Sequence, residues 1–479
     1  MTRLKTRFAS LILLAILAAQ TVTHLAWLPI SAHSGQVAIP WMMNRGMRLF
    51  DTLIEQHAPG SSLMGALVQQ VVPAEPVLAV RFANLLLVLA TTVLVYMLAA
   101  RLSDDRPLVG AAAALVWFWW EPVYGNVMLY FDTLLGFTLL LSAVIWVTLA
   151  RRGGWFTPLL VGLLLGLATL FKQHGWAAVG GFGLWLLVTR QDSRWRDALV
   201  FGAGALAFPA LWLLVMAAQG SLEAYVYWNW GFNFSGLMVN DPLDGDFLRK
   251  LLFTWALVPV FLLILPAKGR AVRVLVLLLW LAGCLTLIPR PGEVHVMGGL
   301  PLMAVMSGVV IVEVLRYLRA LNTDVTARAL AGGLVVVGVA WLWTGAAAYA
   351  RTFTGIPAYD EFAPIVAELE SRAAPGDTLF VLPETDSTPQ LHPMSGLLPP
   401  GTWIKGWFWY LEPPGVVETL LAEWEATPPS YVVIFPDMLA EGEPGITPLV
   451  AFVTGRYTQV AAYEAIPFHG AAEVWALSN

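Results

Sequence analysis

Long apolar runs alternate with short polar connections from residue 8 to about residue 350, and the pattern then changes. A helix that crosses the hydrocarbon core of a membrane needs roughly 20 apolar residues. Runs of about this length predict eleven membrane-spanning helices. The predicted spans cover residues 8–30, 78–100, 108–124, 130–150, 155–171, 174–190, 197–219, 248–267, 271–289, 297–318 and 327–350.

Two connections are longer than a simple turn. Residues 31–77 and 220–247 mix apolar and aromatic residues with polar ones, as in "SSLMGALVQQVV" and "EAYVYWNWGFNF". This pattern is typical of short helices that lie in the plane of the membrane interface. For the Trp-rich segment, an aromatic belt that only anchors the neighbouring helices fits equally well.

The last 129 residues follow the pattern of a small α/β domain. The amphipathic segment "YDEFAPIVAELESRAAPGD" precedes the apolar run "TLFVL", and "PPGVVETLLAEWEATPP" precedes "YVVIF" in the same order. Two further strands are predicted at "YTQVAAYEAI" and "AEVWAL". Helices that alternate with short apolar strands favour a partly parallel sheet. We therefore expect a transmembrane domain over residues 1–350 and an α/β domain over residues 351–479.

Composition agrees with a polytopic membrane protein. Hydrophobic residues make up 58% of the 479 residues and charged residues 12%, with a mean hydropathy of +0.70, which excludes an ordinary soluble protein. The basic N-terminus precedes a long apolar run without a small-residue cleavage site, so a retained signal anchor is predicted. Cys284 is the only cysteine, which leaves no basis for a disulfide framework or a thiolate metal cluster.

The distribution of positive charge predicts the orientation in the cell membrane. With the N-terminus in the cytoplasm, the inner loops hold about twice as many Lys and Arg residues as the outer loops and span ends. This bias agrees with the positive-inside rule. The long loop 31–77 is then on the outer side, and the odd number of spans makes the C-terminal α/β domain extracytoplasmic.

Ionisable residues gather at the outer ends of the predicted spans, where a charge near lipid needs a partner or a task. A proton relay or an ion pathway would place such groups near the midplane of the bilayer. The outer placement instead predicts a site that acts on a molecule at the outer interface. The residues are Asp51, Glu55, His57, Asp132, Lys172, His174, Arg249, Lys250, Arg290, Glu293 and His295.

These residue types suit group transfer from a lipid-phosphate donor. A carboxylate can take the proton from an acceptor hydroxyl, and the candidates for catalysis are Asp51, Glu55 and Asp132. Basic side chains can bind the phosphate and stabilise its charge as it leaves; the candidates are His57, Lys172, Arg249, Lys250, Arg290 and His295. Structural roles stay open for each, such as a snorkelling Lys172 or an Asp132 helix cap.

No metal ligand is assigned from the sequence. In "DPLDGD" the residues Asp241, Asp244 and Asp246 could hold a hard divalent cation, although a solvated turn explains the same pattern. A cofactor is therefore not required, and a divalent cation is left open. The expected partners are the lipid bilayer, a lipid-linked donor and an acceptor, and nucleic acid is not expected.

Several motifs follow one another in the order of a known family. They are "QHAPG", "RFANLLLVLATTVLVYMLAARL", "YFDTLL", "GLLLGLATLFKQHG" and "RPGEVHV". Over about residues 8–320 this order resembles the GT-C membrane glycosyltransferases of the protein O-mannosyltransferase and lipid-A aminoarabinose transferase type, the family 39 or RgtA/B/C/D-like branch. The resemblance implies a GT-C-like fold and inverting hexosyl or pentosyl transfer. The implied donor is a polyprenyl-phosphate sugar, and the implied acceptor is a glycan, a lipid or a protein at the outer face.

The same resemblance suggests roles for four residues. Asp132 matches the second acidic position of the family, and His57 stands where a phosphate-binding Lys is frequent. Lys172 and His295 match the basic positions of later outer turns. For the C-terminal domain, two roles are open: it selects the acceptor or it caps the site.

One stretch departs from the family pattern. An acid usually follows the first span, but this chain reads "SAHSGQVAIP" there, with His33 near the expected position. Because Asp51 is the first carboxylate of the chain, either Asp51 or Glu55 is predicted as the base. The alternative is a non-catalytic protein that binds a lipid-linked glycan or serves in cell-envelope glycan assembly. A transporter agrees less well, since the sequence shows no internal repeat of spans and no midplane charges.

Overall fold

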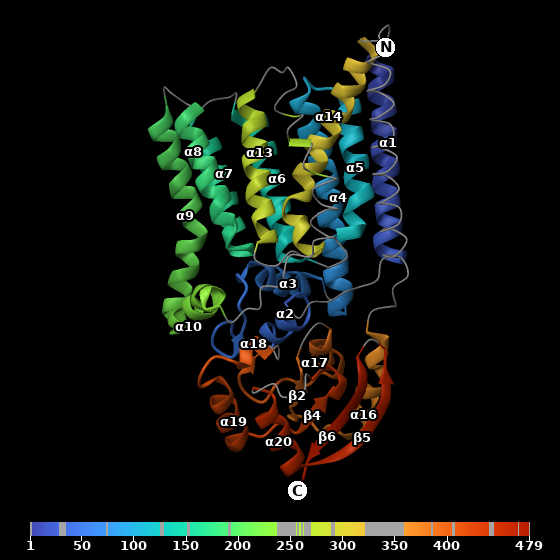
Figure 1. The fold of residues 1–479 in the computed structure, drawn as a ribbon, viewed down its shortest axis with the longest axis vertical. Coiled ribbons are helices and arrows are strands. Elements are labelled where there is room, and N and C mark those ends of the chain that lie inside the picture. The colour runs from blue at the N-terminus through green and yellow to red at the C-terminus, as the bar shows by residue number, and fades with distance from the viewer. Residues whose placement is uncertain are drawn as a thin grey trace. The chain divides into compact units, whose positions relative to one another are not determined.

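The chain folds into two compact units, each assembled from distant segments of the sequence (Figure 1). Unit 1 comprises Met1–Pro29, Arg81–Trp212 and Asn240–Ile356, and unit 2 comprises Ile30–Val80, Leu213–Val239 and Pro357–Asn479. The computed structural model describes residues 2–27, 35–72, 75–124, 129–150, 154–189, 193–236, 255, 258–259, 262, 270–288, 293–320, 359–384, 387–404, 408–439, 445–467 and 469–478.

Unit 1 is a bundle of apolar helices. Its helices within the described residues are α1 (Thr2–Val22), α4 (Pro76–Leu102), α5 (Pro107–Tyr124), α6 (Phe131–Leu149), α7 (Phe156–Phe171), α8 (Gly175–Thr189), α9 (Arg194–Gln219), α13 (Arg270–Cys284) and α14 (Leu300–Ala320). Helices α4 and α9 each have one end in unit 2. Short turns are the π-helical η1 (Thr23–Trp27) and the 3-10 helices η5 (Leu285–Leu287) and η6 (Glu293–Gly298).

The helices follow the predicted spans closely. In the part of the chain that the structure describes, five helical segments are long and apolar enough to cross a membrane: Leu4–Leu25, Pro76–Leu102, Phe131–Leu149, Arg194–Gln219 and Arg270–Leu287. Helices α7 and α8 are apolar but shorter. The predicted span 327–350 lies outside the described residues, and so does most of 248–267.

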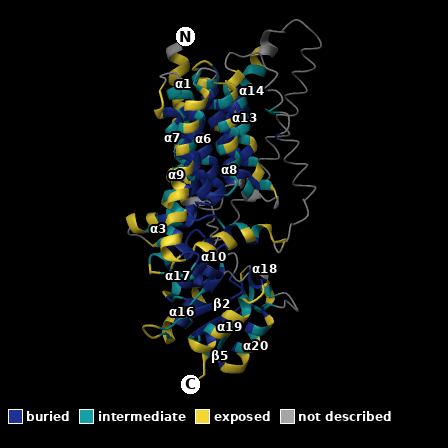
Figure 2. Cartoon of the chain, turned by 90° about the vertical axis from the view of Figure 1, so that its left-hand side faces the viewer, coloured by how far each residue is buried: buried dark blue, intermediate teal, exposed yellow. Residues whose placement is uncertain are grey.

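Small residues let the helices of unit 1 approach closely. A Cβ atom at Gly308 of α14 would lie 2.5 Å from the Ala113 Cβ of α5, and one at Gly166 of α7 would lie 2.4 Å from the Ala205 carbonyl of α9. Such contacts are typical of helices that associate in lipid. Buried residues line the inside of the bundle, whereas exposed residues follow α9, for example Leu199, Leu206 and Leu214 (Figure 2).

Unit 2 combines the first loop, the segment after α9 and the C-terminal region. The first two contribute α2 (Ala38–Met43), β1 (Leu53–Ile54), α3 (Gly60–Val71), α10 (Leu222–Val226), η3 (Tyr227–Gly231) and η4 (Phe232–Phe234). The C-terminal region contributes η7 (Asp360–Phe362), α16 (Ala363–Arg372), β2 (Leu379–Leu382), η8 (Thr388–Gln390), α17 (Leu391–Ser395), β3 (Trp403–Ile404), α18 (Phe408–Leu411), α19 (Val416–Ala426), β4 (Tyr431–Ile434), η9 (Pro436–Met438), α20 (Thr447–Arg456), β5 (Tyr457–Ile466) and β6 (Gly470–Leu477).

A four-stranded mixed sheet organises the C-terminal region, in the order β2-β4-β6-β5. Strands β2 and β4 are parallel, with Leu379 opposite Tyr431, and β6 runs antiparallel to both β4 and β5. All residues of β2 and β4 are buried, as expected for parallel strands covered on both faces. The four strands occupy the segments that the sequence pattern predicts.

A second, two-stranded sheet was not predicted. Strand β1 of the first loop pairs in parallel with β3 of the C-terminal region, with Leu53 opposite Trp403 and Ile54 opposite Ile404. In addition, the Trp403 N–H donates to the Thr52 carbonyl at 2.8 Å. This pairing fixes the first loop, immediately before Glu55, to a segment 350 residues away in the sequence.

Candidate functional site

The predicted site residues fall into both units. Asp132, Lys172 and His295 belong to unit 1, whereas Asp51, Glu55 and His57 belong to unit 2. The remaining predicted residues, Arg249, Lys250 and Arg290, lie outside the described residues. The same is true of His33 and of the acidic turn with Asp241, Asp244 and Asp246.

Three of the predicted residues form one ionic cluster in unit 1. The Lys172 ammonium donates to both carboxylate oxygens of Asp132, each at 2.8 Å. His295 Nδ1 lies 2.9 Å from Asp132 Oδ2 and 3.1 Å from Lys172 Nζ. Asp132 is fully buried, and Lys172 is 7% exposed. The sequence therefore named residues that meet in space, although Asp132 and His295 are 163 positions apart.

Helix ends position Asp132 and Lys172. Asp132 is the second residue of α6, where the unpaired backbone N–H groups of a helix favour a negative charge. Lys172 follows the last residue of α7 and has extended backbone angles, so its side chain leaves the helix. Its ammonium also lies 5.3 Å from the centroid of the Phe131 ring, within range of a cation-π contact.

Close backbone packing positions His295. Its carbonyl accepts a hydrogen bond from Thr286 Oγ1 at 2.6 Å. A Cβ atom at Gly283 of α13 would lie 2.2 Å from the Gly298 carbonyl, and one at Gly136 of α6 would lie 2.4 Å from the Met297 carbonyl. Glycine is required at both positions because η6 lies directly against the two helices. The short η6 helix is therefore held from two sides.

The net charge of this cluster depends on the protonation of His295. Asp132 neutralises Lys172, and protonation of His295 would leave a net positive charge. The His295 side chain is 15% exposed, more than that of Lys172 or Asp132.

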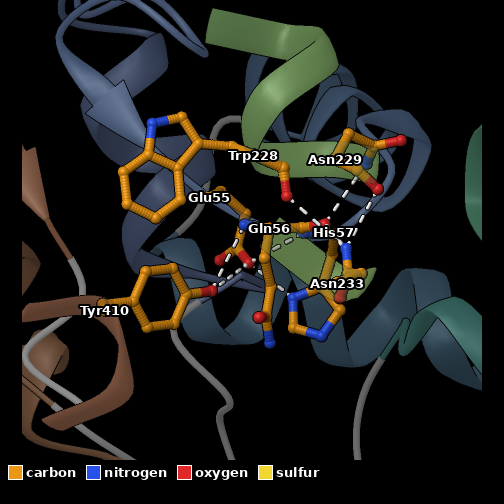
Figure 3. Close-up of polar contacts among 7 residues, drawn as sticks. All are labelled: Glu55, Gln56, His57, Trp228, Asn229, Asn233 and Tyr410. Atoms are coloured by element: carbon orange, nitrogen blue, oxygen red, sulfur yellow. Dashed lines mark hydrogen bonds and ion pairs between the residues drawn. The ribbon is translucent and has the colours of Figure 1, made fainter. Parts of the chain in front are cut away.

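A second cluster surrounds Glu55 in unit 2 (Figure 3). Glu55 Oε1 accepts hydrogen bonds from the Tyr410 hydroxyl at 3.0 Å and from the His57 backbone N–H at 3.1 Å. His57 Nδ1 lies 2.5 Å from the same oxygen. Glu55 is 3% exposed, whereas the His57 side chain is 22% exposed. The two predicted residues therefore form one pair, anchored by a tyrosine of the C-terminal region.

Two asparagines hold the backbone between Glu55 and His57. Asn229 Nδ2 donates to the Gln56 carbonyl at 3.3 Å, and Asn233 Nδ2 donates to it at 3.1 Å. Sequence reasoning missed these asparagines and Tyr410. The spacing of four in "YWNWGFN" places both amides on one helical face and could have indicated a shared target. Nothing in "WFWYLEPPG" indicated Tyr410.

Asp51 takes a different place from Glu55. Its carboxylate forms an ion pair with Arg48 three residues earlier, and its side chain is 36% exposed. The preceding Phe50 has a positive φ of 62°, a conformation that is uncommon for a residue with a side chain. Strand β1 follows after this turn, so Asp51 and the Glu55–His57 pair occupy opposite ends of the strand.

Among the residues that the structure describes, no group of three or more His, Cys, Asp or Glu side chains is arranged to hold a metal ion.

Comparison with known proteins identifies the fold. The family model of dolichyl-phosphate-mannose-protein mannosyltransferases matches residues 56–232. The structure of ArnT from Cupriavidus metallidurans in the apo state is similar over 98% of this chain and 97% of that chain, with a TM-score of 0.65 and 14% identity. The chain has the GT-C glycosyltransferase fold. A search of curated proteins found no match.

Further solved structures resemble this chain over nearly its whole length. The oligosaccharyltransferase of Archaeoglobus fulgidus, tethered with an acceptor peptide, has a TM-score of 0.60 and 12% identity, covering 98% of this chain and 74% of that chain. The mycobacterial arabinofuranosyltransferase AftD has a TM-score of 0.56 and 16% identity, covering 99% and 42%. These matches confirm the resemblance to the GT-C family. Together with the apolar helices, they indicate an integral membrane protein.

Proposed function

We propose that the protein transfers a hexosyl or pentosyl group, with inversion, from a polyprenyl-phosphate donor to an acceptor at the outer face of the cell membrane. The GT-C fold and the mannosyltransferase match support a transferase. Related structures bind the expected kinds of molecule: ArnT was solved with undecaprenyl phosphate, and the archaeal oligosaccharyltransferase AglB with dolichol phosphate and a peptide. The acceptor of the present protein is a glycan, a lipid or a protein.

The buried Lys172–Asp132–His295 cluster is the observation that carries this proposal. Burying a carboxylate in an apolar bundle costs free energy even when two basic partners surround it. Such residues are therefore rare and typically mark a functional site. We assign the donor phosphate to Lys172 and His295, and we assign their orientation to Asp132, which holds both by hydrogen bonds of 2.8 to 2.9 Å. Arg249, Lys250 and Arg290 remain proposed phosphate ligands from the sequence.

Glu55 is the proposed general base. A base must be held in a fixed direction to take a proton from an acceptor hydroxyl, and Glu55 Oε1 is held by Tyr410 and by the His57 backbone N–H. The His57 side chain is 22% exposed, against 3% for Glu55, so its imidazole is more accessible to a ligand. We propose His57 as a phosphate ligand. Asp51 is the weaker candidate for the base, because it pairs with Arg48.

The proposal includes the predicted topology. The distribution of Lys and Arg in the sequence supports a cytoplasmic N-terminus. With eleven spans, the C-terminal α/β region would then lie on the outer side. The eleven-span count and this orientation are predictions that cysteine labelling of loops from each side of sealed vesicles would test.

Transfer assays with purified full-length protein test the proposal. The assay combines a panel of polyprenyl-phosphate sugars with candidate acceptors, and compares wild type with Glu55→Gln, Lys172→Met and Asp51→Asn. We expect wild type to transfer, Glu55→Gln to lose about 100-fold or more in kcat, and Lys172→Met to lose kcat/KM for the donor. Asp51→Asn distinguishes the two candidates for the base: the variant keeps its kcat if Glu55 is the base and loses it if Asp51 is. Normal transfer by both Glu55→Gln and Lys172→Met would contradict the assignment.

A second candidate function rests on one departure from the family. The chain has no carboxylate before Asp51, and His33 stands near the position of the usual acid. A non-catalytic protein that binds a lipid-linked glycan would explain this. If wild type binds the donor without transfer and His33→Asp gains turnover, this alternative is correct; turnover by wild type that His33→Asp does not raise removes it.

A further inference from the structure

We infer that the C-terminal region supplies a positioning residue to the proton-transfer site, namely Tyr410, whose hydroxyl fixes the direction of the Glu55 carboxylate. This inference rests on the proposed function, in which Glu55 is the base. It assigns to the C-terminal region a part in the chemical step, which differs from selection of the acceptor. Tyr410 itself need not touch the substrate.

The hydrogen bonds of the Tyr410 hydroxyl determine where its proton points. The Gln56 backbone N–H donates to the Tyr410 oxygen at 3.2 Å. The hydroxyl has a single proton, and the Glu55 Oε1 atom lies 3.0 Å away to accept it. An ionised carboxylate only accepts hydrogen bonds. The hydroxyl is therefore oriented as a donor to Glu55.

Packing prevents the Tyr410 ring from leaving this position. Tyr410 is fully buried. Its ring stacks on Trp228 with centroids 5.8 Å apart and on Phe232 with centroids 5.3 Å apart. Both aromatic residues belong to the segment that also carries Asn229 and Asn233. A hydrogen bond in such an apolar surrounding is electrostatically stronger than one in water.

The backbone on either side of Glu55 is also held. Before it, β1 pairs with β3 of the C-terminal region. After it, the Gln56 carbonyl accepts from Asn229 and Asn233. With the backbone fixed at both ends, the remaining freedom of Glu55 is that of its own side-chain torsions, and the Tyr410 hydroxyl restricts these. A base that is fixed before the substrate arrives lowers the barrier to proton transfer.

The test is Tyr410→Phe in the full-length protein, which removes one oxygen atom and keeps the stacked ring. We expect kcat to fall about 10- to 100-fold, which corresponds to about 1.4 to 2.7 kcal/mol, while KM for the donor changes less than about twofold. The acid side of the pH–kcat profile should move to higher pH, since Glu55 loses a donor that stabilises its charged form. The titratable His57, whose Nδ1 lies 2.5 Å from the same oxygen, is retained in the variant. A purely structural role of Tyr410 would not shift this profile.

Tyr457→Phe is the matched control. The Tyr457 hydroxyl donates to the Pro429 carbonyl at 2.8 Å, so this variant loses a comparable bond in the C-terminal region without touching Glu55. We expect it to keep the wild-type kcat and pH profile, and melting temperatures show whether both variants fold. If wild type transfers, Glu55→Gln does not, and Tyr410→Phe keeps a normal kcat and pH profile, the inference alone is overturned. Absence of transfer by wild type would overturn the proposed function, and the inference with it.

Discussion

Asp132 and Lys172 show what a charged residue needs inside an apolar bundle. Removing a carboxylate and an ammonium from water costs several kcal/mol per ion, and only good geometry and further hydrogen bonds offset this cost. Lys172 donates to both oxygens of Asp132, and His295 adds a third contact to the carboxylate. Loss of any one partner therefore affects the other two.

Lys172→Met should destabilise the folded protein strongly. It leaves the fully buried Asp132 with His295 as its remaining partner in the cluster, and breaking a buried ion pair in this way typically costs about 3–5 kcal/mol. The double variant Lys172→Met/Asp132→Asn should recover a large part of this loss, because no uncompensated carboxylate remains. Thermal unfolding in detergent, arranged as a double-mutant cycle, measures the coupling.

Arg101→Met is the control for Lys172→Met, because it removes an ion pair that is exposed to solvent. Arg101 lies 3.2 Å from Asp105, and both side chains are largely exposed, at 45% and 64%. Such pairs contribute at most about 1 kcal/mol, so its unfolding temperature should stay close to that of wild type. If Arg101→Met and Lys172→Met lowered the unfolding temperature equally, the buried Lys172–Asp132 pair would contribute no more to stability than an exposed pair.

The sequence singled out the charged members of the two clusters, and it missed the neutral ones. Asp132, Lys172 and His295 are noticed because a charge at the end of an apolar run is costly, and Glu55 and His57 because they share a polar loop. Their exact contacts depend on folding over hundreds of residues. Tyr410 and the two asparagines are uncharged, so they do not stand out in an apolar run. Tyr and Asn occur in many apolar or interfacial segments.

At the scale of elements, the position of η6 depends on two glycines. A Cβ atom at Gly283 would come within 2.2 Å of the Gly298 carbonyl, a backbone atom that cannot rotate away. Gly136 makes the corresponding close approach from α6. Since His295 lies on η6, its distance to Asp132 follows from the fit of this short helix against α6 and α13.

Gly283→Ala should therefore move η6 and weaken donor binding. We expect destabilisation of about 1–3 kcal/mol, the usual range for overpacking, together with lower affinity for polyprenyl phosphate in a binding assay. Gly202→Ala in α9 is the control, because its Cβ meets nothing within 4 Å. That change should be neutral or raise stability by up to about 1 kcal/mol, as Ala favours helix. Equal binding by the two variants would contradict the role of η6.

Element prediction succeeds where the pattern is long and fails where it is short. A span of about 20 apolar residues has few interpretations. Strands β2 and β4 stand out because each follows an amphipathic segment, and β5 and β6 are long enough to show a strand pattern. Strands β1 and β3 have two residues each, too few for any periodicity. Their pairing is decided by tertiary packing, and the sequence offers no local sign of it.

For the whole molecule, unit 2 unites three segments of the chain. Trp403 is one of the residues that join them. It is fully buried, pairs with Leu53 across β3 and β1, and donates its indole N–H to Glu384. Glu384 is fully buried too, and its other oxygen lies 2.7 Å from His392 Nε2. Burial raises the pKa of Glu384.

Trp403→Ala should loosen the first loop as well as the C-terminal region. Truncation of a buried Trp typically costs about 3–5 kcal/mol, and here it also removes a donor from Glu384. We expect faster hydrogen exchange in a peptide that covers residues 50–58, measured by mass spectrometry. Trp475→Ala in β6 is the matched control: Trp475 is only partly buried, and exchange in residues 50–58 should stay as in wild type. Unchanged exchange in Trp403→Ala would contradict the coupling.

The distance along the chain between Glu55 and Tyr410 has a consequence for biosynthesis. The two residues are 355 positions apart, and a ribosome that adds roughly 5–20 residues per second needs about 20 to 70 seconds to make the chain between them. During that time the first loop is already present in the membrane without its tyrosine. On our inference, a chain released before Tyr410 would contain Lys172 and His295 of unit 1 but would lack the hydroxyl that directs Glu55, and it would transfer sugar poorly. Full activity would thus report that translation has continued at least as far as Tyr410.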